Sequence, residues 1–171
     1  MSVDSDIIVK VSLEQGECRF EYFNLVPINS GTWKLEYVKK NEKTRVAGIN
    51  VNFSDCSTQS ELMYEKCVLL VRLPTSDTSY DWRFAFDGIE YVENNSSDGF
   101  QDIRTEMTAD GKTLSIVVQD MNRKDTKDTK DRSAKSTVDL RFIASRRDLK
   151  TNQITLFSSD DPTISIGRGE G

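Results

Sequence analysis

Apolar and polar residues alternate with a period of two along most of the chain, and this alternation predicts β-strands. Trp33, Leu35 and Tyr37, for example, alternate with Lys34 and Glu36. Strand-forming residues occur in short runs between Gly, Pro, Asn, Asp and Ser, and the period of an amphipathic helix is nearly absent. The predicted strands are residues 6–14, 18–25, 32–39, 45–53, 66–73, 80–86, 89–93, 103–108, 113–120, 137–144, 153–157 and 163–166.

Short polar connections between these runs predict hairpins. Gln15-Gly16-Glu17 joins the first two strands, with a glycine available for positive φ, and residues 41–44 form a second polar connection. Asp110-Gly111 is the clearest signal, because a type I′ turn needs two residues that tolerate positive φ. We therefore expect a type I′ hairpin over residues 107–114.

Asp87-Gly88 is predicted to make a similar turn between strands 80–86 and 89–93. The segment before it carries aromatic residues at alternate positions, namely Tyr80, Trp82, Phe84 and Phe86. Side chains at alternate positions of a strand share one face. We expect this aromatic face to form the centre of the core.

Two segments interrupt the strand pattern. Residues 54–65 are polar and predict a helical turn or a loop that crosses between sheets. Residues 123–135 contain a Lys-Asp-Thr repeat without apolar residues, which predicts a flexible charged loop. The many short strands favour an all-β fold, an antiparallel β-sandwich or alternatively a partly closed β-barrel, as a single domain over residues 1–171 with a frayed tail at 167–171.

Charge and hydropathy narrow the possible partners. The 171 residues carry a formal net charge of -5, and only 36% of them are hydrophobic. An acidic surface repels phosphate backbones and anionic lipids, which argues against nucleic acid and membrane partners. The sequence has no apolar run of membrane-spanning length, and its first residues are acidic where a signal peptide is basic. We expect a cytoplasmic protein.

The residues that usually carry catalysis are scarce. The chain has no histidine, which removes the Ser-His-Asp and Cys-His systems and imidazole metal ligation. Its glycines stand singly rather than in a phosphate-binding loop. Cys18, Cys56 and Cys67 lack the close pairing of a zinc site, and we interpret them as buried, reduced, inert thiols. We expect no enzyme activity, no cofactor and no metal.

Acidic residues offer two alternatives to this expectation. A carboxylate-based hydrolase would use a pair from the aromatic-rich region, where the candidates are Asp81, Asp87, Glu90 and Glu93. A calcium site would use loop carboxylates, of which the candidate pairs are Asp98 with Asp102 and Asp160 with Asp161. Solvated strand faces and turns explain both sets more simply, since neither has the spacing of a known motif.

Two groups of residues are candidates for binding. The charged loop carries six basic and three acidic side chains, a local charge of +3 that suits an anionic partner or a neighbouring subunit, although such interleaved charges also keep a loop solvated. Its basic residues are Arg123, Lys124, Lys127, Lys130, Arg132 and Lys135. A carbohydrate platform would instead use Tyr80, Trp82, Tyr91 and Asn94, and it requires an exposed Trp82.

Three segments resemble small, uncharacterised bacterial β-sandwich proteins: residues 82–89, residues 114–122 and Asp161-Pro162-Thr163-Ile164. The last segment is also similar to bacterial inclusion-body proteins of the PixA and AidA type. This second resemblance implies a cytoplasmic β-sandwich that self-associates and binds glycans. Phe157-Ser158-Ser159-Asp160 stands where that family carries a tryptophan before the Asp-Pro pair.

The leading functional hypothesis is a non-enzymatic interaction protein, structural or self-assembling, that uses strand edges and loops. It predicts self-association or a protein partner. A carbohydrate-binding module is the alternative, and a carboxylate-based hydrolase is the third possibility.

Overall fold

The computed structural model describes residues 6–27, 33–54, 57–74, 78–92, 103–120, 136–160 and 163–168. These residues are almost entirely β-structure, which confirms the predicted all-β class. The strands are β1 (Ile7–Ser12), β2 (Cys18–Val26), β3 (Lys34–Lys39), β4 (Glu42–Phe53), β5 (Lys66–Arg72), β6 (Tyr80–Tyr91), β7 (Ile103–Met107), β8 (Thr113–Val118), β9 (Ser136–Asp148), β10 (Ile154–Ser158) and β11 (Thr163–Arg168). A short helix, α1 (Gln59–Leu62), lies in the segment predicted as a helical turn.

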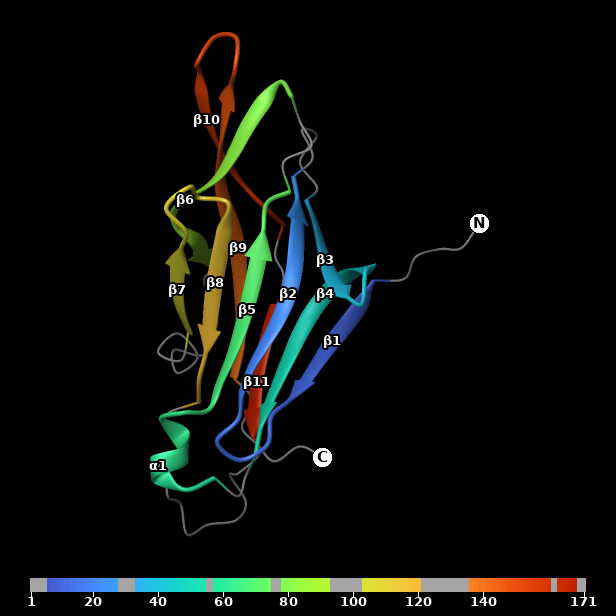
Figure 1. Ribbon diagram of the computed structural model, residues 1–171, viewed down its shortest axis with the longest axis vertical. Helices are drawn as coiled ribbons and strands as arrows, with labels where there is room; N and C mark the ends of the chain where they lie inside the picture. The colour runs from blue at the N-terminus through green and yellow to red at the C-terminus, as the bar shows by residue number, and fades with distance from the viewer. Residues whose placement is uncertain are drawn as a thin grey trace, which may run out of the picture.

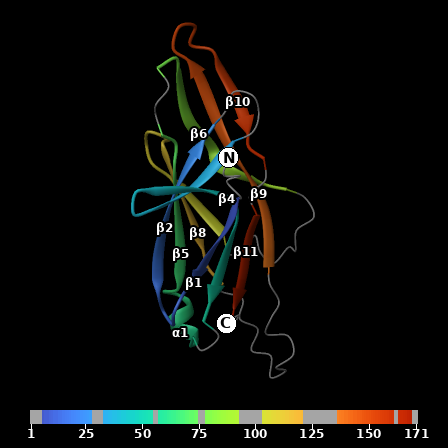
Figure 2. The ribbon, with the colours of Figure 1, turned by 90° about the vertical axis from the view of Figure 1, so that its right-hand side faces the viewer.

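All eleven strands belong to one strongly bent sheet, which closes almost into a barrel (Figures 1 and 2). Its order is β10-β9-β11-β4-β3-β2-β5-β8-β7, with β1 added on β4 and β6 added on β9. The sheet bends because β4 and β9 change partners along their length: β4 pairs with β3 up to Arg45 and with β1 and β11 from Val46 onward. The barrel alternative therefore describes the shape better than two separate sheets.

The sheet is mixed, which corrects the expectation of purely antiparallel strands. Among the described pairings, β1 with β4, β11 with β4, and β2 with β5 are parallel. Alternation along one strand reports which face is buried, but it carries no information on the direction of the partner strand. Whether neighbouring strands run parallel or antiparallel could therefore not be predicted from the alternation.

The hairpin predicted at residues 15–17 is wrong. The chain does turn there, since the Glu17 N–H bonds to the Glu14 carbonyl at 3.2 Å, but β1 then leaves β2 and pairs with β4. β2 instead lies between β3 and β5. Val9 and Val11 of β1 are buried beside β4, so long-range burial selected the partner over the local turn.

The hairpin between β7 and β8 is confirmed, with Met107 opposite Leu114, but its turn is not type I′. Only Gly111 has a positive φ, of 70°. The Asp110 carboxylate accepts a hydrogen bond from the Lys112 N–H at 3.0 Å and so closes a longer loop. Two consecutive positive φ angles occur instead at Lys40 and Asn41, between β3 and β4.

Asp87-Gly88 does not end a strand as predicted. β6 continues from Tyr80 to Tyr91 and contains a bulge between Phe84 and Ile89. Trp82 and Phe84 lie in the core, as expected, whereas Phe86 has a φ of 54° and is 78% exposed. The positive φ angles at Phe86 and Gly88 therefore bend a continuous strand instead of reversing it.

The hydrophobic core fills the inside of the bent sheet. It contains side chains from β1 to β9 and from β11, among them Phe23, Phe53, Leu69, Leu114 and Leu140. Tyr37, Tyr80 and Phe157 are partly buried and pack against this core. The Tyr37 hydroxyl donates to Glu21 at 2.6 Å, and burial together with that carboxylate raises the pKa of Tyr37 to about 12.

Some predictions fall on residues outside the described ranges. These are the charged loop 123–135 with its six basic residues, Cys56, Glu93, Asn94, Asp98, Asp102, Asp161 and residues 169–171. Gly167 and Arg168 belong to β11, so the tail predicted from residue 167 begins too early. No helix in the described residues has the length and apolar character to span a membrane.

Candidate functional site

Three strand segments form a projection beyond the core, which we call the arm. It consists of residues 80–84 of β6, residues 143–148 of β9, and β10. β9 lies in the middle, with β6 on one side and β10 on the other. The arm extends past the ends of β2 and β5 at the top of Figure 1.

Cation–π contacts of Arg146 with two aromatic rings stabilise the inner face of the arm. The Arg146 guanidinium lies 4.3 Å from the ring centre of Tyr80 and 4.8 Å from that of Phe157. The Phe157 ring packs on Trp82 at 5.3 Å, and Trp82 packs edge-on against Trp33 at 5.7 Å. Each cation–π contact contributes about 0.5–1 kcal/mol at a partly exposed site. The inner face is therefore tied to the core.

The outer face of the arm is tied to the β7–β8 turn by an ion network around Asp81. This carboxylate lies 2.6 Å from Lys112 Nζ, 2.9 Å from Arg83 Nε and 3.8 Å from Arg147 Nη2. The hydrogen bond from Lys112 is the main cause that lowers the pKa of Asp81. Lys112 also donates to the Trp82 carbonyl, and the Phe84 N–H bonds to the Gly111 carbonyl at 2.8 Å. These contacts hold β6 against the β7–β8 hairpin.

β10 is the edge strand on one side of the arm, as β6 is on the other. Within the described residues it pairs with β9 alone, so its other side presents unpaired backbone groups. Ile154 is 63% exposed and Leu156 is 54% exposed, and both lie on the outer face, opposite Arg147 and Ser145. An exposed apolar strand with an open edge is a template for pairing with another strand.

Charge distinguishes β10 from other strands at the margin of the sheet. Residues 153–159 contain no charged residue, no glycine and no proline. β1, by contrast, carries Lys10, and β7 carries Arg104 and Glu106. Charged side chains on an edge strand oppose edge-to-edge pairing, and β10 lacks them.

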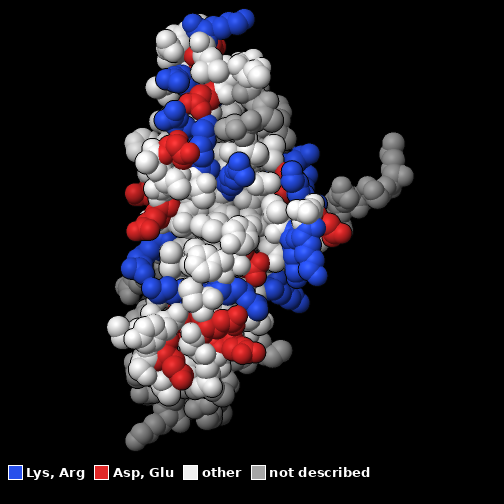
Figure 3. Space-filling view, in the orientation of Figure 1, with Lys and Arg blue, Asp and Glu red and all other residues white. Residues whose placement is uncertain are grey.

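A second exposed apolar area lies on the outer surface of the sheet, where Phe20 and Tyr22 of β2 face outward. Figure 3 shows an uncharged area over the middle of this face, bordered by basic side chains. β2 is paired on both sides, so its backbone offers no open edge. Exposed apolar side chains and an open edge therefore coincide at β10 and not here.

The residues of the predicted carbohydrate platform do not form one surface. Trp82 is only 7% exposed, so its ring offers no face to a sugar, and the Tyr80 ring is covered by Arg146. Tyr91 lies opposite Leu140, six residues of β9 away from the partner of Trp82, a separation of roughly 20 Å. Asn94 lies outside the described residues.

The candidate catalytic and metal-binding carboxylates are also dispersed. Asp81 is engaged by three basic side chains, while Asp87 and Glu90 are exposed on β6 and Asp160 is exposed just beyond β10. The described part of the chain contains no cluster of three Cys, Asp or Glu side chains suited to a metal ion.

The described cysteines differ in their surroundings. Cys67 is fully buried, and burial, followed by the charge of Glu21, raises its pKa to about 12. Cys18 is exposed, which corrects the prediction that it is buried.

Arg146, Ile154 and Leu156 were not predicted as functional residues. The uncharged run 153–159 was the available signal for the two apolar residues. Arg146 gave no signal, because its aromatic partners come from β6 and β10 and meet it only through strand register.

Comparison with curated proteins and with solved structures gives no match. A protein-family model covers almost the whole chain. It is the model of the DP-EP family, which matches residues 5–168, and the chain therefore belongs to the DP-EP family.

Proposed function

We propose that this protein acts by binding rather than by catalysis, and that it self-associates by strand addition at β10. The proposal rests on one observation: β10 has an uncharged, open edge, and Ile154 and Leu156 are exposed beside it. In strand addition the backbone hydrogen bonds supply affinity and the side chains beside them supply specificity. A second copy offers a matching edge, which makes self-pairing the simplest form of the interaction.

The rigidity of the arm supports this proposal. Association is weakened by the entropy lost when mobile groups become ordered. Arg146 fixes the inner face against Tyr80 and Phe157, and Asp81 fixes the outer face to Lys112. β10 is thus presented on a preorganised support.

Sedimentation velocity of single-site variants tests the proposal. We expect the wild-type sedimentation coefficient to rise with protein concentration, and the Leu156→Lys variant to remain monomeric because a charge at the edge opposes pairing. Met63→Lys is the matched control, since Met63 is 62% exposed but lies beside α1. It should associate like the wild type. A wild type that stays monomeric, or Leu156→Lys that associates normally, contradicts the proposal.

Salt dependence separates β10 from the charged loop as the point of contact. Pairing through uncharged β10 should change little between 50 mM and 500 mM NaCl. Contacts made by the basic residues of loop 123–135 would weaken, since salt screens exposed charges. Association that disappears at high salt would assign the contact to the loop.

The burial of Trp82 counts against the carbohydrate-binding alternative. The engagement of Asp81 by three cations counts against its use as the acid of a hydrolase.

A further inference from the structure

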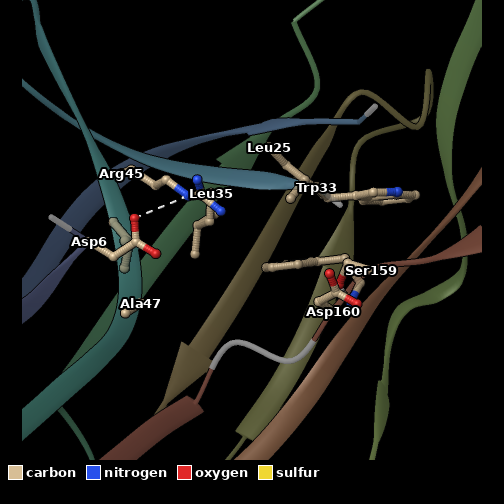
Figure 4. A pocket seen from close by; sticks show the side chains of 10 residues that line it. Asp6, Leu25, Trp33, Leu35, Arg45, Ala47, Ser159 and Asp160 are labelled. Carbon is tan, nitrogen blue, oxygen red and sulfur yellow. Dashed lines mark hydrogen bonds and ion pairs between the residues drawn. The ribbon is translucent and has the colours of Figure 1, made fainter. Parts of the chain in front are cut away.

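A pocket of about 270 Å³ lies beneath the base of the arm, between β4, the β2–β3 region and the end of β10 (Figure 4). Its floor is apolar and consists of residues that are otherwise buried in the core: Leu25, Trp33, Leu35, Val46 and Phe142. The volume is near the lower limit for small-molecule sites, and apolar lining with a few polar groups is typical of them.

Charged groups occupy two sides of the pocket. On one side, Arg45 Nε lies 3.2 Å from the Asp6 carboxylate, so the guanidinium is already neutralised. On the other side lies the Asp160 carboxylate (Figure 4). Among the described residues, no ion pair to Asp160 occurs, so within this part of the rim its carboxylate has no basic partner.

The position of Asp160 is fixed by the residue before it. The Ser159 N–H bonds to the Phe142 carbonyl at 2.9 Å, and the Ser159 hydroxyl accepts the Phe142 N–H at 2.8 Å. Both bonds tie the end of β10 to β9 beside the apolar floor. The backbone that leads into Asp160 is therefore anchored at the rim, and its exposed carboxylate lines the pocket from there.

We propose that this pocket binds a small arylalkylamine as its ammonium ion, with the ring on the apolar floor and the ammonium group at Asp160. The ammonium group would pair with the Asp160 carboxylate, and Trp33 and Phe142 suit an aromatic ring. An anionic ligand would be repelled by Asp160 and would compete with Asp6 for Arg45. This site does not depend on self-association at β10.

Two-dimensional NMR with phenethylamine as the probe tests the proposal. The chain has two tryptophans, so two indole N–H signals are expected, and a Trp33→Phe variant assigns them. We expect phenethylamine to shift the Trp33 signal with a dissociation constant of about millimolar, as befits so small a ligand. 3-Phenylpropionate, which has a similar body with a negative charge, should bind at least about tenfold more weakly.

Single-site variants locate the bound ammonium. Asp160→Asn should weaken phenethylamine binding about fivefold, an effect expected for a partly exposed ion pair. The control Glu106→Gln removes an exposed carboxylate on β7 and should leave binding unchanged. Ala47→Leu enlarges a side chain that lines the pocket and should weaken binding, whereas Ala109→Leu in the exposed β7–β8 turn should not.

The proposal would be overturned by a Trp33 signal unaffected by phenethylamine, by equal binding of 3-phenylpropionate, or by equal binding of phenethylamine to Asp160→Asn. An ammonium group could also come from a lysine side chain of a partner protein. Nα-acetyl-lysine N-methylamide, whose side-chain ammonium is free, tests this source. It should bind more weakly because a single methylene chain fills the apolar floor poorly, and equal or tighter binding would assign the pocket to a lysine side chain of a partner instead.

Discussion

Cys18 and Cys67 lie on neighbouring strands, yet their surroundings predict very different reactivity. The thiolate is the reactive form, and burial raises the pKa of Cys67 to about 12 while also blocking access. Cys18 is exposed on β2. We expect iodoacetamide at pH 8 to alkylate Cys18 at least about tenfold faster than Cys67, as measured by peptide mapping. Similar alkylation rates in the folded protein would contradict the buried position of Cys67. In urea, where the chain is unfolded, the two rates should become equal.

Asp81 predicts a pH-dependent contribution to stability. Its pKa is lowered in the folded state, chiefly by the hydrogen bond from Lys112, so the folded state binds the proton less readily than the unfolded chain does. The stabilisation is therefore fully present above the ordinary pKa of 3.8 and is lost as the pH falls through the lower folded-state pKa. We expect Asp81→Asn to lower the free energy of unfolding by about 1–2 kcal/mol at pH 7.

Urea unfolding of this variant and the wild type at pH 7 and pH 3 measures the effect. The difference between them should shrink at pH 3. Glu90→Gln on the same strand is the control, since Glu90 is exposed, and it should change stability little at either pH. If the loss of unfolding free energy in Asp81→Asn is the same at both pH values, the charge of Asp81 is not the cause of the loss.

At the scale of the strands, the bulge in β6 depends on Gly88. This residue has a φ of 79°, and a Cβ atom added there would lie 2.6 Å from Leu114 Cδ1. Gly88→Ala must therefore strain the backbone and displace Leu114 from the core, at a cost of about 2–3 kcal/mol. Thermal unfolding should show a clear decrease in melting temperature, and Ala85→Gly, away from this contact, should show a smaller one. An unchanged Gly88→Ala variant would contradict the tight packing of the bulge on β8.

The same bulge shows what the sequence could reveal about single elements. The alternation of Tyr80, Trp82 and Phe84 placed a strand and its buried face correctly, because side-chain direction along a strand is a local property. Asp87-Gly88 has the composition of a turn, but positive φ angles serve a bulge as well as a hairpin. The difference depends on β9, which pairs with both halves of β6 and begins 45 residues after β6 ends.

For the whole molecule, most strands could be predicted, but only partners joined by a short turn, such as β7 and β8, could be predicted with them. The parallel pairs β1 with β4 and β2 with β5 join segments separated by long stretches of chain, and local turn signals do not report such pairings. The arm follows the same rule, since Arg146 meets Tyr80 and Phe157 only after three strands are in register. The uncharged β10 sequence was visible, but its position at a free edge was not.

Hydrogen exchange of the β10 amides at low and high protein concentration tests the central claim most directly. Strand addition would protect amides on the free side of β10, so their exchange should slow as concentration rises, while β5, paired with β2 and β8, should not change. Exchange in β10 that is independent of concentration, in a sample shown to associate, would place the contact elsewhere and contradict the account.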